Sequence, residues 1–236
     1  MFEKLIFYVI ILQQISPNTI LEQIRKNTSY RTSKFYAELE IKKGKRNLIK
    51  LFKGFSKVNE FYIEFVNPED KGIKYLKIKE NLYLYLPEID DIVRFSGDML
   101  KQSFMGSDLS YEDIMQEDPL KFYKPLKIID TLINTKKLYS LEIIDTTGKA
   151  PYYCIKLLVD KENYIWIKEE LFTKTGRKIK EVEAIEFKKI NDRYFPISII
   201  MRDLRIKDSY TKFTLLEIEL DVPVPDYIFR LDYLKK

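Results

Sequence analysis

Short runs in which apolar and polar residues alternate recur along almost the whole chain, and turn sequences separate them. Alternation with a period of two places every second side chain on the same face of a β-strand. Residues 35–41 and 48–52 enclose Gly44 and predict a hairpin. Further runs occupy residues 61–66, 72–79, 81–86, 91–95, 138–145, 152–159, 164–172, 177–190, 194–201 and 209–220. Because the connections are short and few helical patterns intervene, we predict a mainly β fold with an antiparallel sheet.

Two segments depart from this pattern. After Ser16 the apolar spacing predicts a short helix, with either Ser16 or Thr19 as its N-cap. Residues 125–137 fit a helix nearly as well as a strand. We find no linker and no clear internal repeat, so residues 17–236 are expected to form a single domain. Seven glycines are few for so many turns, which favours long, strongly twisted strands over a compact sandwich.

The composition excludes several kinds of chemistry. The chain has no histidine, and its one cysteine, Cys154, lies in an apolar run. A Ser-His-Asp or Cys-His nucleophile system, a Cys and His metal cluster and an intramolecular disulfide are therefore excluded. The 41 basic residues are interspersed with 36 acidic ones, so no nucleic-acid surface is predicted. The small positive excess would suit loose contact with an anionic membrane, but a solvated face is the favoured explanation.

The N-terminus has the layout of a secretory signal. Lys4 precedes an apolar stretch, residues 5–12, which is too short to span a bilayer and is followed by polar residues. Residues 1–16 are therefore predicted to be a signal peptide, although Pro17 follows the only small residue near a cleavage site. A buried first helix or strand is the alternative. No cysteine is present here, so lipidation at a lipobox is not expected.

Large apolar residues share one face within several of the predicted strands. In residues 61–66 and 81–86, phenylalanine, isoleucine and leucine alternate with tyrosine. Such a surplus on an antiparallel sheet indicates a thick core, an interface or a cavity for an apolar ligand, and for any single residue the core is the default.

The stretch SFMGSDLSYEDIM, residues 103–115, holds three acidic residues, Asp108, Glu112 and Asp113. They invite a metal-binding or acid/base interpretation. A capped helix is the simpler explanation, because Ser110 can cap a first turn that has Asp113 at its third position. Gly106 would supply the preceding turn. On that basis, loss of Asp113 is expected to cost about 0.5–2 kcal/mol, the range for lost caps.

The wider segment NLYLYLPEIDDIVRFSGDMLKQSFMGSDLSYEDIM resembles the central signature of the LolA-like family of outer-membrane lipoprotein-sorting proteins. The resemblance extends from about Leu21 to Leu234. Its flanks include VDKENYIWIKEELFTKTGRKIK, YFPISIIMRD and PVPDYIF. The residues that carry the central match are Tyr85, Pro87, Val93, Arg94, Phe104, Met105, Gly106, Ser107, Asp108, Tyr111, Glu112 and Asp113.

The resemblance implies a half-open antiparallel β-barrel with an apolar concave face covered by short helices. It implies a monomeric periplasmic carrier, not an enzyme, without a cofactor or metal. Acylated lipoproteins would be the cargo and an inner-membrane ABC-type exporter the donor, while an outer-membrane acceptor stays open. The lipid-binding cavity is assigned to Phe61, Ile63, Phe65, Leu82, Leu84, Leu86, Phe104 and Met105, and a lid to Gly106, Leu109, Ser110, Asp113 and Ile114.

The chain departs from the family in two respects, and two other hypotheses stay open. It lacks the lipidated N-terminal cysteine of the membrane-anchored receptors, and no basic residue that clamps the lid can be matched, with Arg46 and Arg94 as candidates. One other hypothesis is a lipid-binding sensor or scaffold of the same fold that regulates an envelope protein. The second is an acid/base hydrolase that uses Asp90, Asp91, Asp108 or Glu112, and it requires two carboxylates that converge in a cleft.

Overall fold

The computed structural model describes residues 15–115 and 118–236. The predicted signal segment lies outside this range except for Ile15 and Ser16, so its cleavage stays a prediction. Within the described residues, no helix is long and apolar enough to span a membrane.

One antiparallel sheet of 13 strands dominates the described part of the chain, as the alternating pattern predicted. The strand order is β6-β5-β4-β3-β2-β1-β13-β12-β11-β10-β9-β8-β7, so β1 lies beside β13 and the sheet is not closed. The strands are β1 (Thr32–Lys43), β2 (Arg46–Lys57), β3 (Glu60–Phe65), β4 (Lys74–Ile78), β5 (Asn81–Leu86), β6 (Asp91–Phe95), β7 (Tyr123–Ile133), β8 (Lys136–Asp145), β9 (Cys154–Asp160), β10 (Trp166–Phe172), β11 (Lys178–Ile190), β12 (Arg193–Asp203) and β13 (Ser209–Leu220).

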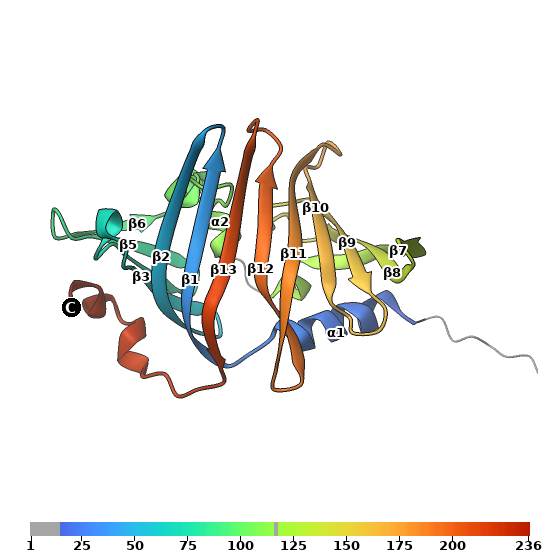
Figure 1. The fold of residues 1–236 in the computed structure, drawn as a ribbon, viewed down its shortest axis with the longest axis horizontal. Coiled ribbons are helices and arrows are strands. Elements are labelled where there is room, and N and C mark those ends of the chain that lie inside the picture. Colours follow the sequence, from blue (N-terminus) through green and yellow to red (C-terminus); the bar gives the residue numbers. More distant parts are fainter. Residues whose placement is uncertain (1–14, 116–117) are drawn as a thin grey trace, which may run out of the picture.

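The sheet is strongly curved. In Figure 1 helix α2 (Tyr111–Ile114) lies behind its central strands, and helix α1 (Pro17–Thr28) lies by the lower ends of β11, β10 and β9. We call the face that they cover the inner face. The remaining helical turns are η1 (Pro68–Asp70), η2 (Gly97–Lys101), η3 (Phe104–Gly106), η4 (Pro119–Lys121), η5 (Asp226–Phe229) and η6 (Leu231–Lys235).

Helix α1 begins where the sequence predicted. Of the two candidate caps, Ser16 holds the position, because its hydroxyl accepts a hydrogen bond from the Thr19 main-chain N–H at 3.1 Å. Pro17 fits the first turn because that position needs no donor. Ile20 and Leu21 then pack on the inner face over β7–β12, in a core that includes Leu157 and Val182.

The ambiguous segment, residues 125–137, is strand rather than helix. It pairs with β8 from Tyr123 to Ile133 and turns at Asn134 and Thr135, both of which have positive φ. The pattern could not decide this, because β7 is an edge strand and most of its side chains are partly or fully exposed.

The apolar and tyrosine faces of β3 and β5 separate as the alternation predicted. Ile63, Phe65 and Leu82 join the inner core with α2. Tyr62 and Tyr83 lie on the other face, where η5 and η6 cover them with apolar residues such as Phe229. The C-terminal segment therefore shields the outer face of this part of the sheet.

Candidate functional site

A cavity of about 630 Å³ lies between the inner face and the segment that precedes β7. Its floor comes from β1, β2, β3 and β13, and its cover from residues 103–115, which we call the lid segment. The apolar lining residues are Phe35, Leu39, Phe52, Phe61, Ile63 and Phe213 on the sheet, and Phe104, Leu109 and Ile114 on the lid segment. The interior can therefore take an apolar ligand.

A glycine in the middle of β2 shapes the floor. Gly54 is opposite Phe35 in the β1–β2 register, and a Cβ added there would stand 2.4 Å from the Phe35 Cζ atom. The bare backbone thus leaves room for the Phe35 ring to lie beside Phe52, with 6.3 Å between the ring centroids. This accounts for a glycine inside a strand, where it otherwise weakens the structure.

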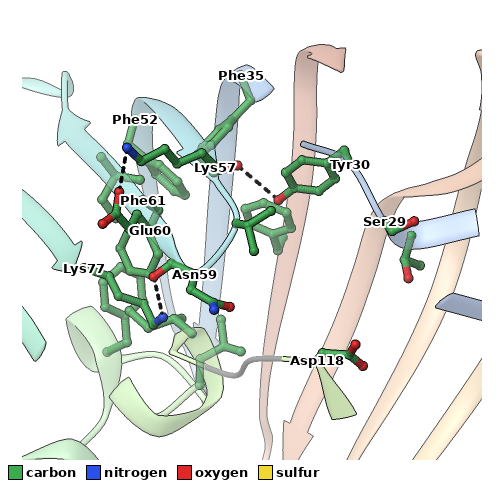
Figure 2. A pocket seen from close by; sticks show the side chains of 18 of the residues that line it. Ser29, Tyr30, Phe35, Phe52, Lys57, Asn59, Glu60, Phe61, Lys77 and Asp118 are labelled. Carbon is green, nitrogen blue, oxygen red and sulfur yellow. Dashed lines mark hydrogen bonds and ion pairs between the residues drawn. The ribbon is translucent and has the colours of Figure 1, made fainter. Parts of the chain in front are cut away.

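Polar and charged side chains surround one rim of the cavity (Figure 2). Lys57 Nζ lies 2.9 Å from Glu60 Oε2, and Lys77 Nζ donates to the Asn59 carbonyl at 2.8 Å. On another side of the rim, Ser56 Oγ donates a hydrogen bond to the Tyr30 hydroxyl at 3.1 Å. The cavity therefore combines an apolar interior with a polar entrance.

The lid segment folds by the local chemistry that the sequence predicted. Gly106 has φ of 79°, and the preceding Met105 is also left-handed, so the chain reverses here. Ser110 caps α2: its hydroxyl accepts from the Asp113 N–H at 3.2 Å, while the Asp113 carboxylate accepts from the Ser110 N–H at 2.7 Å. Both hydrogen bonds of a capping box are present, which confirms the prediction of a capped helix.

Asp113 does more than cap the helix. Its carboxylate also accepts from Lys180 Nζ and from the Tyr152 hydroxyl, each at 2.5 Å. The Lys180 and Asp113 side chains are only 3% and 4% exposed. The cost of about 0.5–2 kcal/mol expected for a lost cap is therefore too low, because losing Asp113 would also leave the buried Lys180 ammonium without its counter-ion.

Neither arginine proposed as a lid clamp holds the lid segment. Arg46 and Arg94 are exposed, in β2 and β6, and the cation beneath the lid segment is Lys180 of β11. The sequence carried one usable signal that was missed, since Lys180 shares its strand parity with the apolar Val182 and Ala184. A lysine on a buried face requires a buried partner.

A second anchor is Asp108, which is 2% exposed. Its carboxylate accepts hydrogen bonds from Ser209 Oγ at 2.9 Å, Thr211 Oγ1 at 2.8 Å and the Asp203 N–H at 3.1 Å. The Asp108 N–H in turn donates to Thr211 Oγ1 at 2.8 Å. The two carboxylates thus fix the lid segment to β11 and to the ends of β12 and β13.

The hydrolase hypothesis finds no support in these contacts. Asp90 bonds to Tyr85 and Lys235 outside the cavity, and Asp108 is occupied by structural donors. Burial raises the pKa of Glu112, but the adjacent Asp113 is enclosed by Lys180 and Tyr152 rather than open to a substrate. Among the described residues, no three or more Asp, Glu or Cys side chains lie close enough together to hold a metal ion.

The predicted cavity residues are only partly brought together. Phe61, Ile63 and Phe104 line the cavity, as do Leu109 and Ile114 of the predicted lid. Phe65 and Leu82 are fully buried beneath it, and Leu84 and Met105 pack against that core. Leu86, at the end of β5, lies outside these clusters. Four further residues line the cavity and were not predicted from the sequence: Phe35, Leu39, Phe52 and Phe213.

One carboxylate on the inner face is expected to make stability depend on pH. The register places Glu169 between Leu157 and Val182, two core residues, and burial, then the charge of Asp113, raises the pKa of Glu169 to about 7. The unfolded carboxyl ionises near pH 4.5. Between these values the unfolded state loses its proton first, so this group should destabilise the fold as pH rises from about 5 to 7.

Replacing Glu169 with glutamine should therefore raise the free energy of unfolding at pH 8 by about 2–3 kcal/mol and leave it unchanged at pH 4. Urea denaturation at both pH values measures this. Glu170→Gln is the control, because Glu170 pairs with Lys178 on the opposite side of the strand. A loss of stability in Glu169→Gln at pH 8 would show instead that the ionised form stabilises the fold.

Known proteins agree with this architecture. A family described as "uncharacterized protein" matches residues 57–236. The structure is similar to that of a DUF1329 family protein from Desulfovibrio piger, with a TM-score of 0.85 and 24% identity over 92% of this chain and 97% of that one. No curated protein matches the chain.

Two further solved structures share the fold. One is described as an outer-membrane lipoprotein-sorting protein domain, from Vibrio parahaemolyticus, with a TM-score of 0.80 and 19% identity over 94% of this chain and 100% of that one. The other is a LolA superfamily protein from Nitrosomonas europaea, with a TM-score of 0.79 and 20% identity over 93% of this chain and 100% of that one. At such identities the likeness establishes the fold. The chain belongs to the family that matches residues 57–236, and its fold is that of the LolA-like, outer-membrane lipoprotein-sorting proteins.

Proposed function

We propose that this protein carries the acyl chains of lipoproteins across the periplasm, from the inner membrane to the outer membrane. The observation that carries the proposal is the apolar cavity between the sheet and the lid segment. Its aromatic floor suits acyl chains, and its polar rim suits the ester and peptide groups to which those chains are attached.

The energetics explain why such a carrier needs a cavity and no chemistry. Exposing an acyl chain to water costs about 0.8 kcal/mol for each CH₂ group, so several long chains cost tens of kcal/mol. Placing part of that surface against Phe35, Phe52 and Phe213 removes the cost for as long as the ligand is bound. The lid segment then has to move for release, because Phe104, Leu109 and Ile114 face the same space.

The partners follow from this role. Acylated lipoproteins would be the cargo and an inner-membrane ABC-type exporter the donor, while the acceptor at the outer membrane stays open. We propose that the mature protein acts in the periplasm as a monomer, without a cofactor. The lipoprotein-sorting description of the Vibrio parahaemolyticus domain supports the choice of cargo.

Adding bulk to the cavity floor tests the proposal. Ile63 lines the cavity from β3, and Ile63→Trp should fill part of the space. We expect the affinity for a fluorescent fatty acid, and for a triacylated lipopeptide that displaces it, to fall about tenfold, with a stability cost of about 1–3 kcal/mol from overpacking. Fluorescence titration and thermal unfolding measure the two effects separately.

Ile89→Trp is the matched control, because Ile89 is 66% exposed and lies outside the cavity. A second variant, Phe61→Ser, removes an apolar contact without adding bulk and should also weaken binding. Unchanged lipopeptide affinity in both cavity variants, with both folded, would contradict the assignment of the cavity to acyl chains.

A further inference from the structure

Three strand connections meet at one end of the sheet, which we call the hairpin end (Figure 1). They join β1 to β2 at residues 44–45, β10 to β11 at residues 173–177 and β12 to β13 at residues 204–208. The Gly44 N–H donates to the Asp208 carbonyl, which joins the first connection to the third. The Leu204 N–H donates to the carbonyl of Ile179, a β11 residue next to the second connection, and both bonds measure 2.9 Å. The three tips therefore form one continuous surface.

The hairpin end is basic. Its three connections carry five basic residues and one acidic residue: Lys45, Lys174, Arg177, Arg205, Lys207 and Asp208. Arg46 adjoins them on β2. All seven are exposed, and among the described residues only Arg205 is in an ion pair, with Asp203 at 2.6 Å. The remaining cations are free to meet an anionic partner.

The opposite ends of the same strands lack this excess. The connections from β2 to β3, β9 to β10 and β11 to β12, residues 58–59, 161–165 and 191–192, carry Lys161, Glu162 and Asp192 as their charged residues. The positive charge is therefore concentrated at one end of the sheet. A solvated face with evenly scattered charges does not produce that asymmetry.

Apolar side chains project among these cations. Leu204 is 45% exposed and Ile206 is 38% exposed, both on the connection from β12 to β13. Leu48 and Ile49, on β2 just beyond Arg46, are exposed as well. Beside them lies a surface hollow to which Leu204 and Ile206 contribute, together with Lys42 and Arg202. Apolar residues surrounded by basic ones suit a partner that has both an apolar region and negative charge.

We propose that the hairpin end docks on a lipid surface that carries anionic headgroups. Each basic residue near such a surface gains attraction from the negative surface potential, and exposed aliphatic side chains gain by entering the region between headgroups and acyl chains. Nucleic acid carries the negative charge but has no apolar region into which Leu204 and Ile206 could insert. Docking would hold the carrier at the membrane between loading and release.

The docking surface and the cavity are separate. The cavity rim uses residues 28–30 and 57–61, whereas the hairpin end uses residues 44–46, 173–177 and 204–208. Substitutions at the tips therefore leave the cavity lining intact. Failure of vesicle binding and failure of acyl-chain binding are distinguishable results.

The test is cosedimentation of the full chain with vesicles of phosphatidylcholine, with or without about one third phosphatidylglycerol. We expect binding to the anionic vesicles, weak binding to the neutral ones and a decrease at high salt. Lys45→Glu/Arg46→Glu should weaken anionic-vesicle binding about tenfold or more. Leu204→Ser/Ile206→Ser should weaken it several-fold at unchanged charge, which isolates the aliphatic contribution.

Lys188→Glu/Lys189→Glu is the matched control, since it makes the same change in net charge on two exposed lysines near the other end of β11. It should bind anionic vesicles within about twofold of the wild type. Equal losses in the test and control pairs would reduce the effect to net charge and overturn the proposal. Equal wild-type binding to neutral vesicles, or tighter binding to duplex DNA at matched phosphate concentration, would overturn it as well.

Discussion

Replacing Lys180 with methionine is expected to lower the free energy of unfolding by about 3–5 kcal/mol. The substitution keeps the length of the side chain but leaves the Asp113 carboxylate buried without its cation, next to the carboxyl of Glu169. For a chain of this size the melting temperature should fall by roughly 6–20 °C. Urea and thermal denaturation measure both quantities.

Two further variants identify the cause of that loss. Lys178→Met is the control on the same strand, because Lys178 pairs with Glu170 and Glu181 at partly exposed positions and should cost no more than about 1 kcal/mol. In the double variant Asp113→Asn/Lys180→Met neither charge is buried alone, so much of the lost stability should return. A double variant as unstable as the sum of the single ones would show that the two side chains are not coupled.

The lid should also respond to the loss of Lys180. Helix α2 spans only Tyr111–Ile114, which is too short to be stable without tertiary contacts. With the ion pair removed, the capping box and the contacts of Phe104 and Tyr111 remain to hold α2 in place. Because the lid segment is then held more weakly, release of a bound fluorescent fatty acid should become faster at temperatures at which the rest of the protein stays folded.

Most of the fold could be predicted from the sequence, because the residues that determine each strand and turn are close together in the chain. Alternation sets the inward face of each strand, and Gly44 and the sequence around Ser110 specify a turn and a cap within a few residues. Even so, one strand required more than parity. A bulge in β10 between Trp166 and Lys168 lets Trp166 and Leu171 both pack on the inner core, despite their opposite parity.

The candidate site was harder to predict from the sequence, because its contacts join distant parts of the chain. Asp113 and Lys180 are 67 positions apart, and their meeting depends on how the lid segment lies across the sheet. The cavity floor combines Phe52 of β2 with Phe213 of β13, which come together only because β1 pairs with both strands. A parity pattern predicts the face of each residue but not which strands become neighbours.

Substitutions of Asp108 are expected to lower stability by different amounts, and the order of these losses shows whether Asp108 anchors the lid segment or acts as a catalytic acid. Asp108→Ala removes the acceptor of three buried hydrogen bonds, from Ser209, Thr211 and the Asp203 N–H. The two hydroxyls can rotate toward other acceptors, but the main-chain N–H cannot. We expect a loss of about 2–3 kcal/mol in the free energy of unfolding and faster amide exchange in residues 103–115.

Asp108→Asn should lose less, about 1 kcal/mol, because its carbonyl oxygen can still accept from the Asp203 N–H while its amide donates to a hydroxyl. Asp98→Ala is the control, since the Asp98 side chain is 92% exposed and its ion pair with Lys101 contributes little. A catalytic carboxylate predicts the reverse order of sensitivity, with Asn abolishing a turnover while stability is unchanged. If the asparagine and alanine variants prove equally unstable, the negative charge itself holds the lid segment, and the hydrogen-bond account of Asp108 fails.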